Sequence, residues 1–220
     1  YQQGLDGDIQ GTRVGVLTEL LNDEQVEPEV REAVVNATAV LKKLGARVEE
    51  VSVPLTQHAN VISAVLLAVE PAQNHRDWVR TRLQDYGHDN RIGLLTGSLI
   101  PAQAYLKAQK LRSLLRQQIL EALKTVDVLI SPTSGRSGVA IQDDPVITSK
   151  ETTSRLPFMR TNTFNLASSP AISVPCGFSS QGLPIGLQIG GAPGGEEAVL
   201  KLAYAYEQST SWHTMRPPAL

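Results

Sequence analysis

The 220-residue sequence has only one cysteine and no long apolar run, which argues against a disulfide-bonded or a membrane-spanning chain. Its single cysteine, Cys176, excludes an intrachain disulfide and suits a reducing compartment, so we expect a cytoplasmic protein. Because Cys176 ends an apolar segment, we interpret it as a small buried hydrophobic residue rather than a nucleophile. The longest apolar run, residues 61–69, is far shorter than the ~18 residues of a membrane span, so we expect no membrane partner.

Charge and histidine pattern are equally uninformative about a partner or a metal. The net charge of −2 gives no electrostatic reason to expect a nucleic-acid partner. The histidines form no H-x-x-x-H or H-E-x-x-H pair, so we predict no metal site and no cofactor. A P-loop and a G-x-S-x-G motif are also missing. No standard catalytic constellation can therefore be assembled from this sequence.

Hydrophobic periodicity predicts an α/β protein, in which strands alternate with helices. A strand at residues 12–17, a helix from Pro28 to Gly45 and a strand at 47–53 form a parallel crossover unit. The pattern of residues 56–85 predicts one long or broken helix, and we expect it to be interrupted near Pro71. The remaining expected elements are a short helix within 89–98, a helix at 101–124, a buried strand at 127–130, a loop at 134–150 and a helix at 196–208.

The most informative stretch is residues 164–191, which alternates with a period of two. This alternation predicts two short strands, each with one apolar face and one face of small or uncharged residues. Pro175 cannot donate a ladder hydrogen bond, so its position is predicted to be a sheet edge or a bulge. From the pattern alone, an ordinary hairpin-like pair in a mixed sheet is the favoured interpretation. The apolar positions are Ile172, Val174 and Cys176 in the first strand and Ile185, Leu187 and Ile189 in the second.

The exact residues of this stretch resemble the C-terminal half of the amidase signature family, whose members hydrolyse or transfer carboxamide groups. The resemblance rests on Asn165-Leu166 and on residues 170–177 and 182–189, and it extends from about residue 6 to 218 with a weak part at 56–98. It implies a mixed, mostly parallel β-sheet covered by helices. Residues 1–220 would then be the C-terminal portion of a single amidase domain.

The resemblance also implies where the catalytic residues are. Family members use a Ser–cisSer–Lys triad in their N-terminal half, and this sequence has no counterpart of that segment. We therefore expect no catalytic residue here, and we expect the isolated chain to be inactive. The sequence begins without methionine, so we expect a piece of a longer protein. The expected partners are a small-molecule amide substrate, the N-terminal half of the same amidase and, because of an uncovered sheet edge, a possible homodimer.

Three functions remain open from the sequence. The first is part of an amidase that hydrolyses the C–N bond of a small carboxamide. The second is the A subunit of a tRNA-dependent amidotransferase. The third is a non-catalytic binding or scaffold domain that descends from an amidase.

Candidate substrate-binding residues come from the resemblance. Tyr105 and Arg112 lie seven residues apart on one flank of the expected helix, and the family arginine with this spacing contacts the carboxylate of the amide donor. A surface arginine that packs its stem beside the apolar stripe is the alternative for Arg112. Phe158 stands where the amidotransferase members place an acidic residue, which implies an apolar acyl pocket and a preference for aryl or alkyl amides over glutamine.

A polar cluster precedes the informative stretch. Thr161, Asn162 and Thr163 are uncharged and consecutive, and they either line the substrate entrance or cap a helix. The doublet Ser168-Ser169 resembles no nucleophile motif, so we interpret it as structural.

Overall fold

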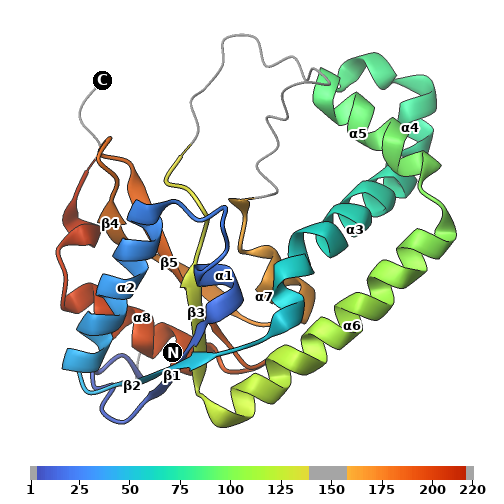
Figure 1. Ribbon diagram of the computed structural model, residues 1–220. Coiled ribbons are helices and arrows are strands. Elements are labelled where there is room, and N and C mark those ends of the chain that lie inside the picture. Colours follow the sequence, from blue (N-terminus) through green and yellow to red (C-terminus); the bar gives the residue numbers. More distant parts are fainter. Residues whose placement is uncertain (1–3, 139–157, 217–220) are drawn as a thin grey trace.

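The computed structural model describes residues 4–138 and 158–216, and its centre is a five-stranded sheet with the order β2-β1-β3-β5-β4 (Figure 1). The pairs β1–β2 and β1–β3 are parallel, whereas β3–β5 and β5–β4 are antiparallel. Four of the five strands therefore point the same way, which confirms the expected mixed, mostly parallel sheet. The strands are β1 (Arg13–Leu17), β2 (Arg47–Val51), β3 (Val128–Pro132), β4 (Ala171–Phe178) and β5 (Pro184–Gly191).

The predicted crossover unit is formed by β1, α2 (Pro28–Lys43) and β2. Pro28 occupies the first turn of α2, where its missing N–H costs no hydrogen bond. Two lysines lie in the last turn, and Gly45 then turns the chain with a φ of 92°. Between β1 and α2 the chain also forms α1 (Thr18–Leu21), a single turn that the periodicity did not predict because it is too short to show one.

Helices cover both faces of the sheet (Figure 1). α2 and α8 (Glu196–Gln208) pack on one face, and α3, α6 and α7 (Asn162–Ala167) pack on the other. Successive residues of β3 alternate between these layers, since Val128 and Ile130 join the first core and Leu129 joins the second. A strand that is buried on both faces reads as a continuous apolar run, and this explains the sequence of β3.

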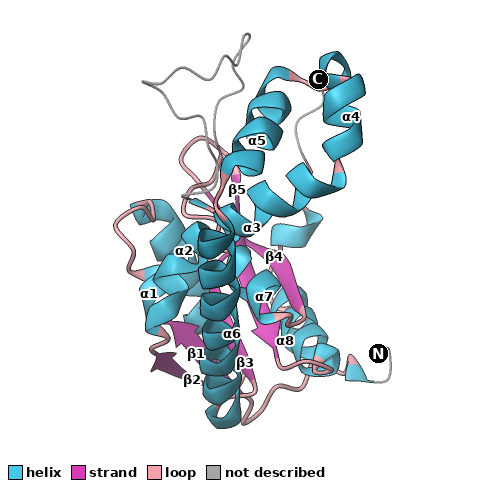
Figure 2. Cartoon of the chain, turned by 90° about the vertical axis from the view of Figure 1, so that its right-hand side faces the viewer, coloured by secondary structure: helices cyan, strands magenta, loops and turns pink. Residues whose placement is uncertain are grey.

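The helical part between β2 and β3 extends away from the sheet (Figures 1 and 2). The helix predicted to be interrupted near Pro71 is broken, but α3 continues through Pro71 and the interruption falls at His75, four residues later. Pro71 lies in the last turn, where it removes one hydrogen bond, and the buried side chains of Leu66 and Ala72 hold the helix on both sides of it. The elements here are η2 (Pro54–His58), α3 (Ala59–Asn74), α4 (Arg76–Thr81), η3 (Leu83–Asp85), α5 (His88–Leu99) and α6 (Ala102–Thr125).

Two predictions about this region are refined. The short helix expected within 89–98 is a full helix, α5, of 12 residues. Of the loop expected at 134–150, residues 139–150 lie outside the described residues. None of the helices in the described part of the chain has the length and apolar character needed to cross a membrane.

β4 and β5 form the predicted antiparallel pair. Pro175 lies on the edge strand of the sheet, and the register shifts between Pro175 and Gly177, so both alternatives predicted for this proline are present. Cys176 is buried, and burial raises the pKa of its thiol to about 12, which fits a structural residue. Gly190 lies against the ring of Phe164, where a Cβ atom would overlap the ring, so glycine is required for α7 to approach the sheet. α8 has the predicted bounds.

Candidate functional site

A cleft of about 820 Å³ opens at the carboxyl ends of the parallel strands. Its walls come from the segment after β1, from η2 and the start of α3 after β2, and from residues 159–163. Ligands of α/β proteins commonly bind at this end of the strands, because the connections there diverge and leave a crevice. The lining residues are Glu19, Leu20, Asn22, Asp23, Glu24, Gln25, Thr56, Gln57, Ala59, Asn60, Val61, Ala64, Met159, Arg160 and Thr163.

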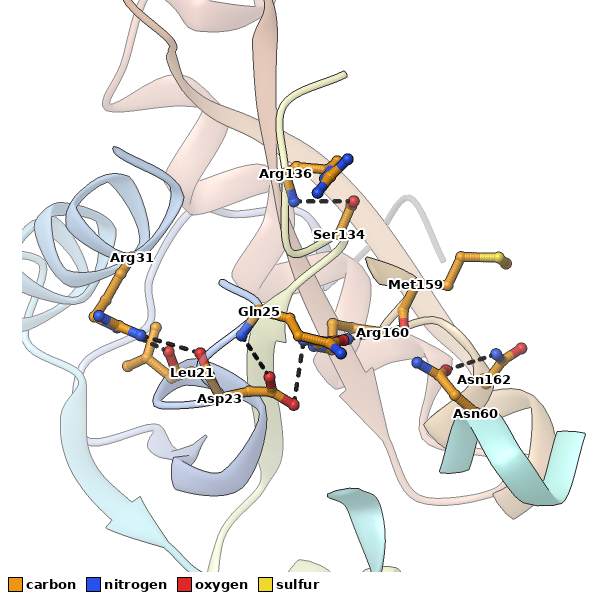
Figure 3. Close-up of polar contacts among 10 residues, drawn as sticks. All are labelled: Leu21, Asp23, Gln25, Arg31, Asn60, Ser134, Arg136, Met159, Arg160 and Asn162. Carbon is orange, nitrogen blue, oxygen red and sulfur yellow. Dashed lines mark hydrogen bonds and ion pairs between the residues drawn. The ribbon is translucent and has the colours of Figure 1, made fainter. Parts of the chain in front are cut away.

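Arg160 is the cation of this cleft (Figure 3). Only 3% of its side chain is exposed, and its Nη2 lies 3.4 Å from Oδ2 of Asp23. Burial lowers the pKa of the guanidinium, and the Asp23 carboxylate opposes that shift, so the group stays charged at neutral pH. Asp23 is itself fixed, since its Oδ1 accepts a hydrogen bond from the N–H of Gln25 and its carbonyl accepts one from Arg31.

A second polar contact attaches the first residue of α7 to helix α3 (Figure 3). Nδ2 of Asn162 donates to Oδ1 of Asn60 over 2.8 Å, and Oδ1 of Asn162 accepts a hydrogen bond from the Ser63 hydroxyl over 3.2 Å. Thr163, which follows, is fully buried and lines the cleft, and its hydroxyl has no hydrogen-bond partner among the described residues. A buried hydroxyl without a partner in the protein is suited to meet a polar group of a bound molecule.

The cleft carries more negative than positive charge. Three carboxylates, those of Glu19, Asp23 and Glu24, line it beside Arg160. Burial alone would raise the pKa of Glu19, but hydrogen bonds from Ser52, from the N–H of Val53 and from Thr18 outweigh burial and lower that pKa.

Glu19 therefore stays ionised, and its carboxylate accepts hydrogen bonds from the chain segment that follows β2. The lining contains no lysine, histidine or cysteine, so these residues can bind and orient a ligand but offer no nucleophile and base pair. No group of three or more metal-ligating side chains occurs within residues 4–138 and 158–216.

A smaller hollow of about 330 Å³ lies on the other side of a shared wall. Backbone hydrogen bonds join the two strands of this wall: the N–H of Arg160 donates to the carbonyl of Thr133, and the N–H of Gly135 donates to the carbonyl of Phe158. Ser134 and Met159 also pair as an isolated bridge. The lining residues of the hollow are Thr133, Ser134, Arg136, Ser137, Ser173, Pro175, Pro184, Ile185 and Gly186.

The structure places Arg112 away from both openings. Its Nε donates to the carbonyl of Leu166 over 3.2 Å and its Nη2 to the hydroxyl of Ser168 over 3.3 Å. Arg116, one turn further, donates to the carbonyl of Ala167. Two arginines of α6 thus hold the C-terminal end of α7, where a helix favours cations. Arg112 lines neither the cleft nor the hollow, and its contact with a substrate carboxylate stays a prediction.

Tyr105 and Phe158 also have partners within the chain. The hydroxyl of Tyr105 donates to Oε1 of Glu70 over 3.0 Å and accepts a hydrogen bond from Gln109, which ties α6 to α3. The ring of Phe158 lies 3.3 Å from the guanidinium carbon of Arg136, in a cation–π contact. Tyr105 does not line the cleft, whereas Phe158 belongs to the wall between the two openings.

In the polar cluster at 161–163, Thr163 lines the cleft, Asn162 is bonded to α3, and Thr161, at the N-cap position of α7, makes no side-chain capping hydrogen bond. Sequence reasoning missed Arg160 and Asp23, the ion pair at the centre of the cleft. The only signal for Arg160 is an arginine directly ahead of a polar cluster and an apolar helix.

Comparison with known proteins identifies the family to which this fold belongs. The model of the Amidase family matches residues 1–200. This chain belongs to the amidase family. The amidase-family chain is 36% identical to the A subunit of the glutamyl-tRNA(Gln) amidotransferase of Methanosarcina barkeri over 99% of its own length and 50% of that protein. It therefore spans about half the length of the curated relatives it matches.

Solved structures of the family share the fold. A bacterial aryl acylamidase of the amidase signature family superposes with a TM-score of 0.82 at 20% identity, over 97% of this chain and 46% of that one. The A subunit of the glutamyl-tRNA(Gln) amidotransferase of Thermotoga maritima superposes with a TM-score of 0.69 at 26% identity, over 93% of this chain and 44% of that one. The predicted family and fold class are confirmed.

Proposed function

We propose that this chain is the C-terminal portion of a single amidase domain that breaks the C–N bond of a carboxamide. The observation that supports this most directly is the cleft at the carboxyl ends of the strands, which has the volume of a small-molecule site and polar groups but no lysine, histidine or cysteine in its lining. A site that can bind and cannot react fits one wall of an active site. The half-length match to the relatives supports a missing second half.

In this proposal the other half supplies the chemistry. A serine attacks the amide carbonyl, a second serine passes the proton to the leaving nitrogen, and a lysine acts as the base, as the family resemblance implies. Water then hydrolyses the acyl-enzyme and regenerates the serine, and the released ammonia either leaves or is used for a second reaction. The residues of this chain hold the substrate, with Thr163 and Arg160 directed at its polar groups.

Two fates of the released ammonia define two candidates. The A subunit of an amidotransferase is the candidate that the curated relatives support, and it would require partner subunits and an amide donor such as glutamine. A hydrolase of simple amides is supported by Phe158, because its ring and the overlying Arg136 provide no carboxylate for the amino group of a donor. In both candidates the same first step releases ammonia.

Ammonia release by the complete polypeptide tests the proposal. The complete enzyme is assayed with glutamine and with simple aryl and alkyl amides, each with and without glutamyl-tRNA(Gln). Ammonia from glutamine that is consumed only when the tRNA is present would identify the amidotransferase. Ammonia from aryl or alkyl amides alone would identify the hydrolase, and binding without release of ammonia from any amide would identify a scaffold.

The isolated chain of 220 residues is the matched control, and we expect it to release no ammonia. Size-exclusion chromatography of the same sample tests the predicted homodimer. Turnover that survives purification and disappears when one serine of this chain is replaced would contradict the division of labour between the halves.

A further inference from the structure

We propose that the smaller hollow is a subsite for a carboxylate carried by the amide substrate, with Arg136 as its cation. This inference rests on the proposed function and narrows the substrate to an amide that also bears an acidic group. The hollow is bounded by the end of β3, the edge strand β4 and the first residues of β5. A wall of two hydrogen-bonded backbone segments separates it from the larger cleft.

Arg136 has the geometry of a carboxylate receptor. One face of its guanidinium lies on the Phe158 ring, at 3.3 Å from the centroid, and this stacking leaves the N–H donors at the edge of the group to face other partners. Its Nε has no hydrogen-bond partner among the described residues and lies 3.8 Å from Oε1 of Glu27. About 34% of the side chain is exposed, so a ligand can approach it from solvent. A planar donor fork of this kind matches a carboxylate.

Two hydroxyls complete the donor set. Oγ1 of Thr133 and Oγ of Ser173 lie 2.6 Å apart across the ends of β3 and β4. Since only one of these hydroxyls can donate to the other, the second retains a proton for a further acceptor. The floor beneath them is Gly186, where a Cβ atom would come within 2.7 Å of both hydroxyl oxygens. Glycine at this position therefore keeps the space in front of the hydroxyls open.

The charge around the hollow also selects an anion. None of the described residues that line it bears a carboxylate, in contrast to the larger cleft with its three. Glu27 does not line the hollow, but its Oε1 lies 3.8 Å from Nε of Arg136 and its Oε2 accepts a hydrogen bond from the N–H of Ser137. A carboxylate in the hollow would meet Arg136 and hydroxyl donors and no lining carboxylate, whereas the same group in the cleft would meet Arg160 together with three carboxylates. An acidic amide is therefore oriented with its acid toward Arg136.

The test compares two probes that differ by one charge. Calorimetric binding to the 220-residue chain is measured with succinamate, which bears a carboxylate and a carboxamide, and with succinamide, which bears two carboxamides. We expect succinamate to bind at least tenfold more tightly. Arg136→Gln should abolish the difference, Arg136→Lys should keep part of it, and Gly186→Ala should weaken succinamate alone. Arg13→Gln is the matched control: Arg13 is the first residue of β1 and does not line the hollow, so this variant should retain the full preference.

The outcomes separate this subsite from the proposed function. Equal affinity for the two probes, binding of neither, or a preference that persists in Arg136→Gln would overturn the subsite, because every residue that builds it belongs to this chain. Loss of the preference in Arg112→Gln instead would assign it to the other arginine. Inorganic phosphate that competes as well as succinamate would make the hollow a general anion site. If the complete enzyme released no ammonia while succinamate binding still depended on Arg136, the proposed function would fail and the subsite would stand.

Discussion

The ion pair of Arg160 and Asp23 allows a direct comparison of burial with distance. The two charges are 3.4 Å apart, with side chains that are 3% and 26% exposed. Arg13 and Asp127 are closer, at 2.6 Å, but their side chains are 46% and 38% exposed. If distance decided the strength of a pair, the second would be stronger. Because water screens exposed charges, we expect the first pair to be the more strongly coupled.

The perturbation is Asp23→Asn, which keeps an oxygen for the N–H of Gln25 and removes only the charge. The guanidinium of Arg160 then remains buried without its countercharge. Removal of one partner from a fully buried pair costs about 3–5 kcal/mol, and the partial exposure of Asp23 reduces our expectation to about 2 kcal/mol. Arg160→Met should cost less, since the remaining carboxylate is reached by water.

Urea unfolding of the two single variants and the double variant measures the coupling. We expect the double variant to be more stable than the sum of the single effects by about 1–2 kcal/mol, and we expect the same cycle at Arg13 and Asp127 to give a smaller coupling. Additive effects at Arg160 and Asp23 within about 0.5 kcal/mol would refute the reasoning. So would a larger coupling at the exposed pair.

Further predictions concern packing and the single thiol. Leu115→Ala should lower the free energy of unfolding by about 2–5 kcal/mol, whereas Leu114→Ala, at a side chain that is 45% exposed, should change it by less than about 0.5 kcal/mol, as urea unfolding would show. Gly190→Ala should destabilise the protein because its Cβ overlaps the ring beneath it, whereas Gly93→Ala, in open space on a helix, should raise the melting temperature. Cys176 should not react with a thiol reagent at pH 8 until the protein is unfolded, because burial raises its pKa to about 12. Since the unfolded thiol ionises first, Cys176 should also lower the stability progressively as the pH rises from about 8.5, the ordinary value, towards 12.

Local patterns predicted the elements of this fold well where one pattern covers a whole element. The helix that begins at Pro28 carries its own start and stop signals, and the alternation of residues 172–176 carries its own period. The interruption near Pro71 was placed four residues too early, because the effect of a proline depends on how far the helix continues and on what holds its ends, which the neighbouring residues do not specify. The four-residue helix after β1 has no periodicity to read.

The candidate site was predicted poorly for a related reason. Burial of Arg160 results from the approach of segments that lie 137 positions apart in the sequence, since its partner is Asp23. A charged residue is usually exposed, so the sequence alone favours the wrong environment. For Arg112 the spacing from Tyr105 predicts a ligand contact, which stays a prediction, and its donors in this structure are directed at the end of α7. The family resemblance singled out Phe158 but not Arg136, whose guanidinium lies on its ring.

The wall between the cleft and the hollow gives the two openings a fixed relation. It consists of residues 133–135 and 158–160, and backbone hydrogen bonds join its two strands to each other. A third bond, from the N–H of Glu27 to the carbonyl of Gly135, attaches the wall to the start of α2. The cleft on one side of this hydrogen-bonded wall has an excess of carboxylates, and the hollow on the other side has an arginine and no lining carboxylate. An amide with its acidic group in the hollow would have its orientation set by its own charges, and the position of its C–N bond relative to the other half of the domain would follow from that orientation.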